Sequence, residues 1–349
     1  MDEQILKIGL PAGSLADPKR GGSLISLLEI AGFKTHGYES GGPSRFSTIN
    51  YLFGWDGRPQ EFGSQLGINE LDVAIAGDDW IYERKLELQL EYNKNIKLEK
   101  ILSLRRGFVE IVGIVNNDNE HKTILDILRM LCKERQLISV VSEMPYIALN
   151  WIYENLKKIG EYDKFKNFSV QKYKTPGKIK QGVIVYETWG KTEAKVKNMG
   201  ADIGVEITQT GSAIRNYGLK VIDTVMKSET GIWINPQIRS DNKKYDLLKM
   251  FVLNMYGVVN AENKVMILFN VSNENVHQIE KYLRDNNLFA DEPTVNVGKT
   301  FTEFSIQVDI TDPDIPLAKI RYELAKRKAV NINTIPVDSS IQNLEILGI

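Results

Sequence analysis

The stretch GADIGVEITQTGSAIRNYGLKVID, residues 200–223, decides the fold class. Its apolar run over 201–208 predicts a buried strand, and the polar turn at 208–213 follows directly. Ile214 and Arg215 then open a short predicted helix. A buried strand that runs through a short polar turn into a helix is the repeating unit of α/β proteins with parallel sheets.

The turn at 208–213 combines residue types that suit a phosphate group. Gly211 lets the backbone approach an anion closely, and the free backbone N–H groups of such a turn point at the ligand. Asp202 and Glu206, just upstream, are candidates to accept hydrogen bonds from ribose hydroxyls. Turns rich in Gly, Thr and Ser are common, so the pattern alone leaves a plain loop as the alternative.

Strands and helices alternate along most of the chain. Further strands are predicted at 5–11, 71–80, 108–115, 137–143 and 182–188, and helices at 23–33, 121–134 and 244–259. The stretches 219–228 and 230–236 are interpreted as a strand pair or as a strand and a turn. This alternation predicts a parallel sheet covered on both faces. After residue 256 the pattern becomes β-α-β-α-β, typical of a ferredoxin-like α+β unit.

Composition narrows the class of protein. A chain of 349 residues is too long for one compact core and indicates two or three domains. The net charge of -1 gives no bulk attraction to nucleic acid or to an anionic membrane. The single cysteine, Cys132, excludes an internal disulfide and a cysteine metal cluster, and its place on an apolar helix face favours a buried thiol.

The first residues and the hydropathy of the chain indicate the cellular compartment. The first residues lack the basic region and long apolar stretch of a secretion signal. No window approaches the roughly 20 apolar residues that a membrane span needs. We therefore expect a cytoplasmic protein with neither a nucleic-acid nor a membrane partner.

The chain resembles the long form of the ATP phosphoribosyltransferase family. Residues 199–219, MGADIGVEITQTGSAIRNYGL, follow the family motif G-L-A-D-A-I-V-D-I-V-S-T-G-x-T-L-R-x-N-G-L. Further matches occur in the family's order: K-G-x-L at 12–15, R-x-x-D-I-P from Arg58, D-L-G-I-T-G-x-D-W at 72–80, T-E-Y-P at 142–145, G-S-V-E at 190–193 and P-T-V at 293–295. Their order and spacing together are more specific than any one motif.

The resemblance implies a two-lobed α/β core, like a type II periplasmic binding protein, followed by an ACT-like domain. Residues 1–104 and 217–255 would form lobe one, and 105–216 lobe two, which carries the loop for phosphoribosyl pyrophosphate. Residues 256–349 would form the C-terminal ACT-like α+β regulatory domain. Long-form members resemble one another in being hexamers inhibited by histidine, so we expect a homo-oligomer, a hexamer or, as the alternative, a dimer.

The implied reaction is attack of adenine N1 of ATP on ribose C1 of phosphoribosyl pyrophosphate, the first step of histidine biosynthesis. Mg2+ would bridge the oxygens of the leaving pyrophosphate, and the protein would align two anionic substrates and stabilise the leaving group. No catalytic nucleophile is needed, and the sequence offers no convincing triad.

Matching positions imply roles for individual residues. The 5′-phosphate loop would comprise Gln209, Thr210, Gly211, Ser212, Ala213 and Ile214, directly after Thr208, a further substrate contact. Arg58 and Lys191 would meet pyrophosphate. Glu193 would lie beside the reacting ring, and Asp202 and Glu206 would hold ribose hydroxyls or the waters of Mg2+. Further substrate contacts are expected at Gly13, Ser14, Asp79, Trp80 and Glu143, and a small polar effector at Asn270, Ser272, Thr294 and Asn296. Structural alternatives stay open: core packing for Trp80, a surface acid for Glu193 and a surface ion pair for Arg58.

Departures from the family pattern keep other functions open. Ala12 replaces a lysine and Ala213 a threonine, which removes a cation and a hydroxyl donor, although Lys191 in G-K-T-E adds a positive charge. Glu206 is one methylene longer than the family aspartate, and the segment through Trp151 also differs. The alternatives are a non-catalytic two-lobed small-molecule sensor and a phosphoribosyltransferase with a different acceptor base.

Overall fold

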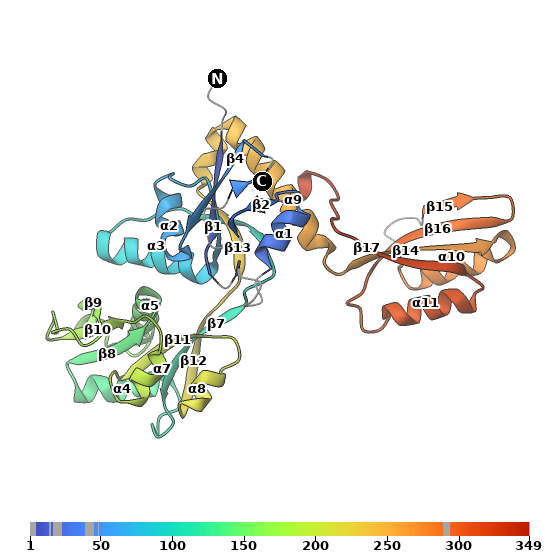
Figure 1. Ribbon diagram of the computed structural model, residues 1–349. Coiled ribbons are helices and arrows are strands. Elements are labelled where there is room, and N and C mark those ends of the chain that lie inside the picture. Colours follow the sequence, from blue (N-terminus) through green and yellow to red (C-terminus); the bar gives the residue numbers. More distant parts are fainter. Residues whose placement is uncertain are drawn as a thin grey trace. The chain divides into compact units, whose positions relative to one another are not determined.

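The computed structural model describes residues 5–13, 15–16, 23–38, 45–47, 49–288 and 294–348. The chain folds into two compact units (Figure 1). The first comprises Met1–Ser23 and His36–Leu248, and the second comprises Leu24–Thr35 and Lys249–Ile349. The mixed α/β architecture expected from the sequence is confirmed in the first unit, and the α+β architecture in the second.

One sheet of the first unit has the order β4-β1-β5-β13-β6. Its strands are β1 (Leu6–Pro11), β4 (Leu52–Gly57), β5 (Val73–Gly77), β6 (Glu99–Ser103) and β13 (Thr230–Ile234). Strand β1 runs parallel to β4 and β5, whereas β13 is antiparallel to β5 and β6. Helices α2 (Pro59–Gly67) and α3 (Asp78–Tyr92) bury β5 in one apolar cluster that includes Phe62, Ala74 and Ile81.

The other sheet of this unit has the order β12-β7-β11-β8-β10-β9. Its strands are β7 (Val109–Asn116), β8 (Leu137–Ser142), β9 (Phe168–Lys172), β10 (Gly182–Glu187), β11 (Ile203–Thr208) and β12 (Leu219–Ser228). Strands β8 to β11 run parallel, and β7 is antiparallel to β11 and β12. The helices are α4 (Ile124–Glu134), α5 (Pro145–Lys158), α6 (Tyr162–Phe165), α7 (Thr192–Lys197) and α8 (Ser212–Asn216).

The segment 219–236 does not form a strand pair. Strand β12 pairs with β7 in the second sheet, and β13 pairs with β5 and β6 in the first. By sheet membership the chain therefore returns to the first sheet at Thr230, later than residue 217. The division into two lobes at 104 and 216 remains our proposal with that adjustment.

The strand expected at 71–80 is shorter than predicted. It ends at Gly77, and Asp78, Asp79 and Trp80 begin the 15-residue helix α3 instead of a polar turn. Sequence periodicity misses this helix because it packs against both α2 and α5, so its apolar residues do not gather on one face. Asp78 and Asp79 lie in its first turn, where carboxylates interact favourably with the helix dipole.

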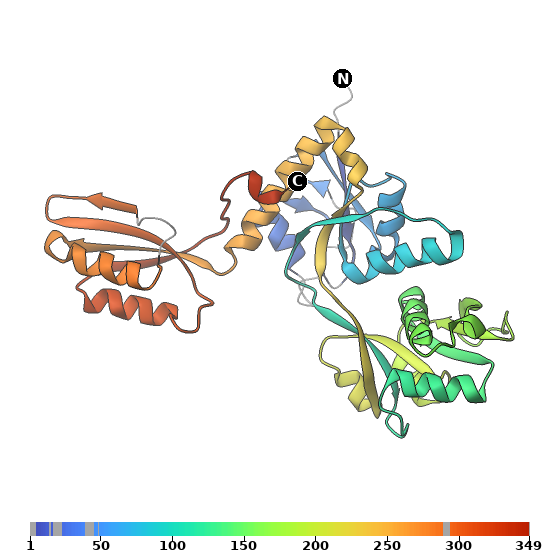
Figure 2. The same cartoon turned by 180° about the vertical axis from the view of Figure 1, so that it is seen from behind.

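The second unit holds a four-stranded antiparallel sheet with the order β15-β16-β14-β17. Its strands are β14 (Lys264–Ser272), β15 (Thr294–Val297), β16 (Phe301–Asp309) and β17 (Val330–Pro336). Helices α10 (Val276–Asp285) and α11 (Leu317–Lys326) cover one face, as Figure 2 shows. Phe269 and Phe304 stack at 5.2 Å in the core beneath them.

The remaining elements are α1 (Leu24–Ile30), β2 (Thr35–His36), β3 (Arg45–Phe46) and α9 (Asn242–Ala261). Phe33, just after α1, contacts Phe251 of α9 at a ring distance of 4.9 Å. The expected boundary at 255/256 lies inside α9, so the start of the C-terminal domain also remains a proposal. None of the described helices is long and apolar enough to cross a membrane.

Candidate active site

A cavity of about 660 Å³ lies where several strands of the first sheet end. Its lining includes five residues that the sequence singled out from separate segments: Gly13, Arg58, Asp79, Trp80 and Gln209. Gly13 follows β1, Arg58 follows β4, and Asp79 and Trp80 follow β5. The carboxyl ends of parallel strands are the usual ligand-binding edge of α/β sheets.

The charges of this larger cavity favour an anion. Arg58 is exposed, and its side chain makes no hydrogen bond or ion pair with the described residues. Arg106 also lines the cavity. Among the described lining residues the one acid is Asp79, which is only 4% exposed. Burial raises the pKa of its carboxyl, although the Ser228 hydroxyl acts in the opposite direction. A carboxyl that is easily neutralised beside two arginines leaves the cavity positive.

A smaller cavity of about 430 Å³ shares part of this wall. Arg58, Gln60, Trp80 and Trp189 line both cavities. The rest of the smaller lining is rich in acids: Glu61, Glu83, Glu87, Glu143 and Glu187, with Arg84, Pro145, Tyr146, Val170 and Thr188. The lining of the smaller cavity is therefore rich in acidic side chains, whereas that of the larger cavity is basic.

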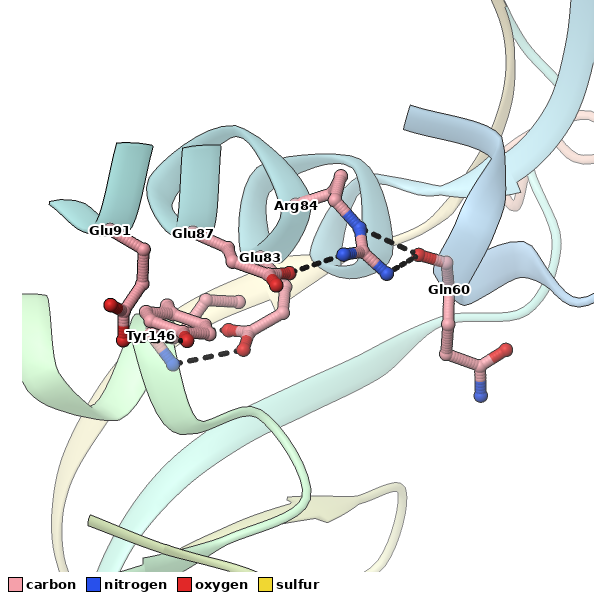
Figure 3. A network of polar contacts seen from close by, with 7 residues as sticks. Gln60, Glu83, Arg84, Glu87, Glu91 and Tyr146 are labelled. Atoms are coloured by element: carbon pink, nitrogen blue, oxygen red, sulfur yellow. Dashed lines mark hydrogen bonds and ion pairs between the residues drawn. The ribbon is translucent and has the colours of Figure 1, made fainter. Parts of the chain in front are cut away.

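Helix α3 and the start of α5 meet beside the smaller cavity (Figure 3). The Glu83 carboxylate accepts hydrogen bonds from the backbone N–H groups of Tyr146 at 2.9 Å and Ile147 at 2.7 Å. These donors lie in the first turn of α5, where N–H groups have no partner within the helix. Burial raises the pKa of Glu83 to about 8, and this outweighs the two backbone donors, which lower it. Glu83 of α3, which packs on the first sheet, therefore caps the N-terminus of α5, which packs on the second.

Three further contacts belong to the same network (Figure 3). Tyr146 donates its hydroxyl to Glu91 at 3.0 Å. Arg84 donates to the backbone oxygen of Gln60 at 2.9 and 3.1 Å and pairs with Glu87. Burial also raises the pKa of Glu87, although Arg84 opposes this shift. The network joins α2, α3 and α5 and fixes one wall of the smaller cavity.

The turn at 208–213 forms as predicted and leads into α8. Gly211 adopts φ 67°, a left-handed conformation that glycine reaches without strain. Thr208 Oγ1 accepts from the N–H of Gly211 at 2.8 Å, and the hydroxyls of Thr210 and Ser212 lie 2.9 Å apart. A Cβ at position 211 would lie 2.9 Å from Nη1 of Arg215, so that guanidinium lies over the turn. Arg215 is a cation that the candidate set omitted.

Three predicted acids lie near one another. Burial raises the pKa of Glu206 to about 7, and the neighbouring charges of Glu193 and then Glu143 add to the shift. Burial likewise raises the pKa of Glu143, whose carboxylate accepts from the N–H of Gly190. Lys191 is exposed in a left-handed conformation directly before α7. Among the described residues no three His, Cys, Asp or Glu side chains form a group that could hold a metal ion.

Asp202 is not brought to this group. It precedes β11, whereas the turn follows the same strand, so the six residues of β11 separate them by about 20 Å. Its carboxylate accepts from the N–H of Ser139 at 2.9 Å and from the Ser139 hydroxyl at 2.7 Å, and it pairs with Arg135. These contacts join β8 to β11. Ser14, another candidate, lies outside the described residues.

The four candidate effector residues share one face of the C-terminal sheet. In the register of the sheet, Asn270 and Asn296 both lie opposite Glu303, and Thr294 lies opposite Ser305. The alternate residues of β14 are buried under the helices, so Asn270 and Ser272 point to the other face. Ser272 Oγ accepts from Asn275 at 2.6 Å. Their role stays a prediction.

Two α/β lobes with an arginine-lined cavity at the strand ends, beside a Thr-Gly-Ser turn, define a protein that binds phosphorylated small molecules. A family model for ATP phosphoribosyltransferases matches residues 58–256, more than half of the chain. The chain belongs to the ATP phosphoribosyltransferase family. It is thus an enzyme of the pentosyltransferase class that acts in the first step of histidine biosynthesis, and the sensor interpretation is not favoured.

Curated relatives carry the family's name, and one solved structure of the family is also similar in part. An ATP phosphoribosyltransferase of Thermodesulfovibrio yellowstonii is 24% identical over 332 residues, 94% of each chain. That of Chlorobium luteolum is 27% identical over 282 residues, 79% of each chain. The ATP phosphoribosyl transferase (HisG:HisZ) complex from Thermotoga maritima contains a chain with 15% identity and a TM-score of 0.48, covering 72% of this chain and 98% of its own.

Proposed function

We propose that this chain joins ATP to phosphoribosyl pyrophosphate in the first unit, at the two adjoining cavities. One observation carries the proposal: motif residues from separate segments, among them Gly13, Arg58, Asp79 and Gln209, line one cavity. The positive charge of that cavity suits polyphosphate groups. Nothing in this reaction requires a covalent intermediate, so binding and orientation supply the catalysis.

The turn at 208–213 and Arg215 hold the 5′-phosphate of phosphoribosyl pyrophosphate in this proposal. The hydroxyls of Thr210 and Ser212 offer donors, and Arg215 supplies the charge. Arg58, assisted by Lys191, stabilises the negative charge that grows on pyrophosphate as the ribose C1–O bond breaks. Glu193 lies beside the reacting ring.

The family's reaction uses a divalent metal ion, and we propose that this ion is Mg2+. Mg2+ keeps several waters and takes few protein ligands, usually one or two carboxylates together with substrate oxygens. No three acids among the described residues form a metal group, so the ion would take one or two carboxylates, those of Glu143 and Glu206, with substrate oxygens and waters as its other ligands. Burial raises the pKa of both carboxyls, and a nearby cation would stabilise their charged form. Bound Mg2+ would neutralise charge on the pyrophosphate. Asp202 is assigned a structural role because Ser139 and Arg135 already engage its carboxylate.

Regulation by histidine, a hexameric assembly and a cytoplasmic location are the remaining parts of the proposal. Asn270, Ser272, Thr294 and Asn296 offer donors and acceptors on the sheet face opposite the helices, where a small polar effector would bind. Cys132 is buried as a free thiol, which agrees with a reducing compartment.

The test is a turnover assay with ATP, phosphoribosyl pyrophosphate and Mg2+, with pyrophosphatase to remove one product. Formation of N1-(5-phosphoribosyl)-ATP, followed by ultraviolet absorbance, is the expected result. A lower rate with added histidine would support the regulatory proposal. Binding of both substrates without product would instead support a sensor. Product with another purine triphosphate, but not with ATP, would support a different acceptor base.

A further inference from the structure

The smaller cavity has flat apolar walls that are only partly covered. Trp80, Pro145, Tyr146 and Val170 line it together with Trp189. Trp189 is 80% exposed and makes no ring contact with the described residues. A volume of about 430 Å³ lies in the range of small-ligand pockets. A planar ring is the ligand group that would cover such an indole best, because stacked aromatic rings gain energy beyond the area that they bury.

Two acceptor groups among the residues that line this cavity have no partner in the described part of the chain. The Glu187 carboxylate, at the end of β10, makes no hydrogen bond or ion pair with the described residues. Gln60 Oε1 is buried and likewise accepts no hydrogen bond from the part of the chain that the structure describes. Buried polar atoms nearly always have partners in the functional state. A complementary ligand would therefore present hydrogen-bond donors.

The cations near this cavity do not reverse that conclusion. Arg84 is engaged by Glu87 and by the backbone oxygen of Gln60. Arg58 lies in the wall shared with the larger cavity. A polyphosphate would therefore be attracted to Arg58 and Arg106 of the larger cavity rather than to the acid-rich lining of the smaller one. The two cavities together orient a ligand that has a donor-bearing ring at one end and phosphates at the other.

We propose that the smaller cavity holds the adenine ring of ATP between Trp80 and Trp189, with Glu187 as a catalytic residue that accepts a hydrogen bond from the exocyclic amine. This inference rests on the proposed function. In the reaction the N1 lone pair forms the bond to ribose C1, and the C1–O bond breaks with its electrons leaving on pyrophosphate. Positive charge then spreads over N1, C6 and the amine nitrogen, whose hydrogens stay in place during the step.

Glu187 interacts more strongly with that ring as its charge develops. A carboxylate that faces the amine stabilises the transition state and the alkylated ring more than it stabilises neutral adenine, and only such a difference accelerates the chemistry. Glu187 would discriminate against a purine that lacks the amine, since its carboxylate would stay unpaired.

The experiment compares ATP with purine riboside triphosphate, which keeps N1 and lacks the amine, in the wild type and in Glu187→Gln. We expect the variant to lower kcat/KM for ATP by about 10- to 100-fold, as for loss of a hydrogen bond to a charged group. The value for the purine riboside analogue should change by less than about threefold. Where the analogue reacts too slowly, its inhibition constant against ATP gives the same comparison.

A matched control is Glu154→Gln, which removes an exposed carboxylate of α5 that pairs with Lys157 at 2.8 Å. This variant should keep kcat/KM for both substrates within about twofold of the wild-type values. The inference would be overturned if Glu187→Gln lowered kcat/KM equally for both substrates, or lowered it for neither. Absence of ATP turnover by the wild type would instead refute the proposed function. The comparison would then be made on dissociation constants, where unchanged ATP affinity in Glu187→Gln would still overturn the placement of the ring.

Discussion

The two adjoining cavities of the first unit differ in charge and in how the chain builds them. The larger one gathers residues that follow strand ends, such as Gly13 after β1 and Arg58 after β4, and it is positive. The smaller one lies where α3 packs against α5, and its wall is lined by glutamates. The difference shows that strand ends bring together the residues of the basic cavity, whereas the packing of α3 against α5 brings together those of the acid-rich one.

The largest effect is expected from a substitution at Gly211, in the turn beside the larger, basic cavity. In Gly211→Asp the added carboxylate would occupy the phosphate position of the turn that contributes Gln209 to the larger cavity. We expect affinity for phosphoribosyl pyrophosphate to fall by more than about 100-fold, measured by calorimetry, because two like charges would meet at close range. The protein should stay folded, since Asp tolerates the left-handed conformation at modest cost.

Gly211→Asn is the matched control for that variant. It has nearly the same shape and the same backbone preference, but it adds no charge. Its affinity should fall by no more than about tenfold if repulsion is the main cause. Equal losses in the two variants would show that shape, and not charge, governs the turn. Unchanged affinity in folded Gly211→Asp would remove the turn from the site.

The next largest effect is expected at Arg58, the cation that both cavities share. Arg58→Ala should lower kcat by about 100-fold, comparable to the loss of one group that stabilises transition-state charge. The melting temperature should hardly move, because the side chain makes no hydrogen bond or ion pair with the described residues. Arg58→Lys should recover part of the rate, since it restores the charge without the planar fork. A large loss of stability in Arg58→Ala would instead indicate a structural role.

The sequence could predict residues of the larger cavity better than residues of the smaller one. Gly13, Asp79 and the 208–213 turn could be located because each stands at the end of an apolar run, and strand ends share an edge. Glu83 and Tyr146 lie more than 60 residues apart, and their contact exists only because α3 and α5 pack together. Because periodicity did not reveal α3 as a helix, its face toward α5 could not be predicted.

The misplacement of Asp202 has a different origin. Asp202 and Glu206 are four residues apart, which looks close in the sequence, but an extended strand advances about 3.3 Å per residue. Asp202 therefore lies near the start of β11, and Glu206 lies near its end. The motif as a whole identified the family, but assigning the same role to both acids ignored the length of the strand between them.

A smaller effect concerns the Glu83 cap and its dependence on pH. The carboxyl has a pKa of about 8 in the folded protein and an ordinary value of 4.5. Between these values the folded chain holds the proton and the unfolded chain does not, so stability should fall as pH rises through this window. The slope would be at most about 1.4 kcal/mol per pH unit. Glu83→Gln cannot titrate, so its unfolding free energy should lack this slope.

Urea unfolding of both proteins at several pH values between 5 and 9 measures that difference. The free energy of the wild type relative to Glu83→Gln should decline with rising pH and level off above about pH 8. A difference that does not change with pH would mean that the two backbone donors, and not burial, control the carboxyl. A difference that grows with pH would show a lowered pKa and would contradict the burial argument.

The smallest effect on activity is expected at Asp202, an acid outside both cavities. Asp202→Asn weakens the contacts with Ser139 and the ion pair with Arg135, so the free energy of unfolding should fall by about 1–3 kcal/mol. Ser139→Ala should lower stability in the same direction, because it removes the hydroxyl from the same contact. Both variants should keep kcat and KM for phosphoribosyl pyrophosphate within about twofold of the wild type. If Asp202 held ribose or the metal ion, kcat/KM would fall sharply in Asp202→Asn and not in Ser139→Ala, so the pair of variants separates a structural acid from a catalytic one.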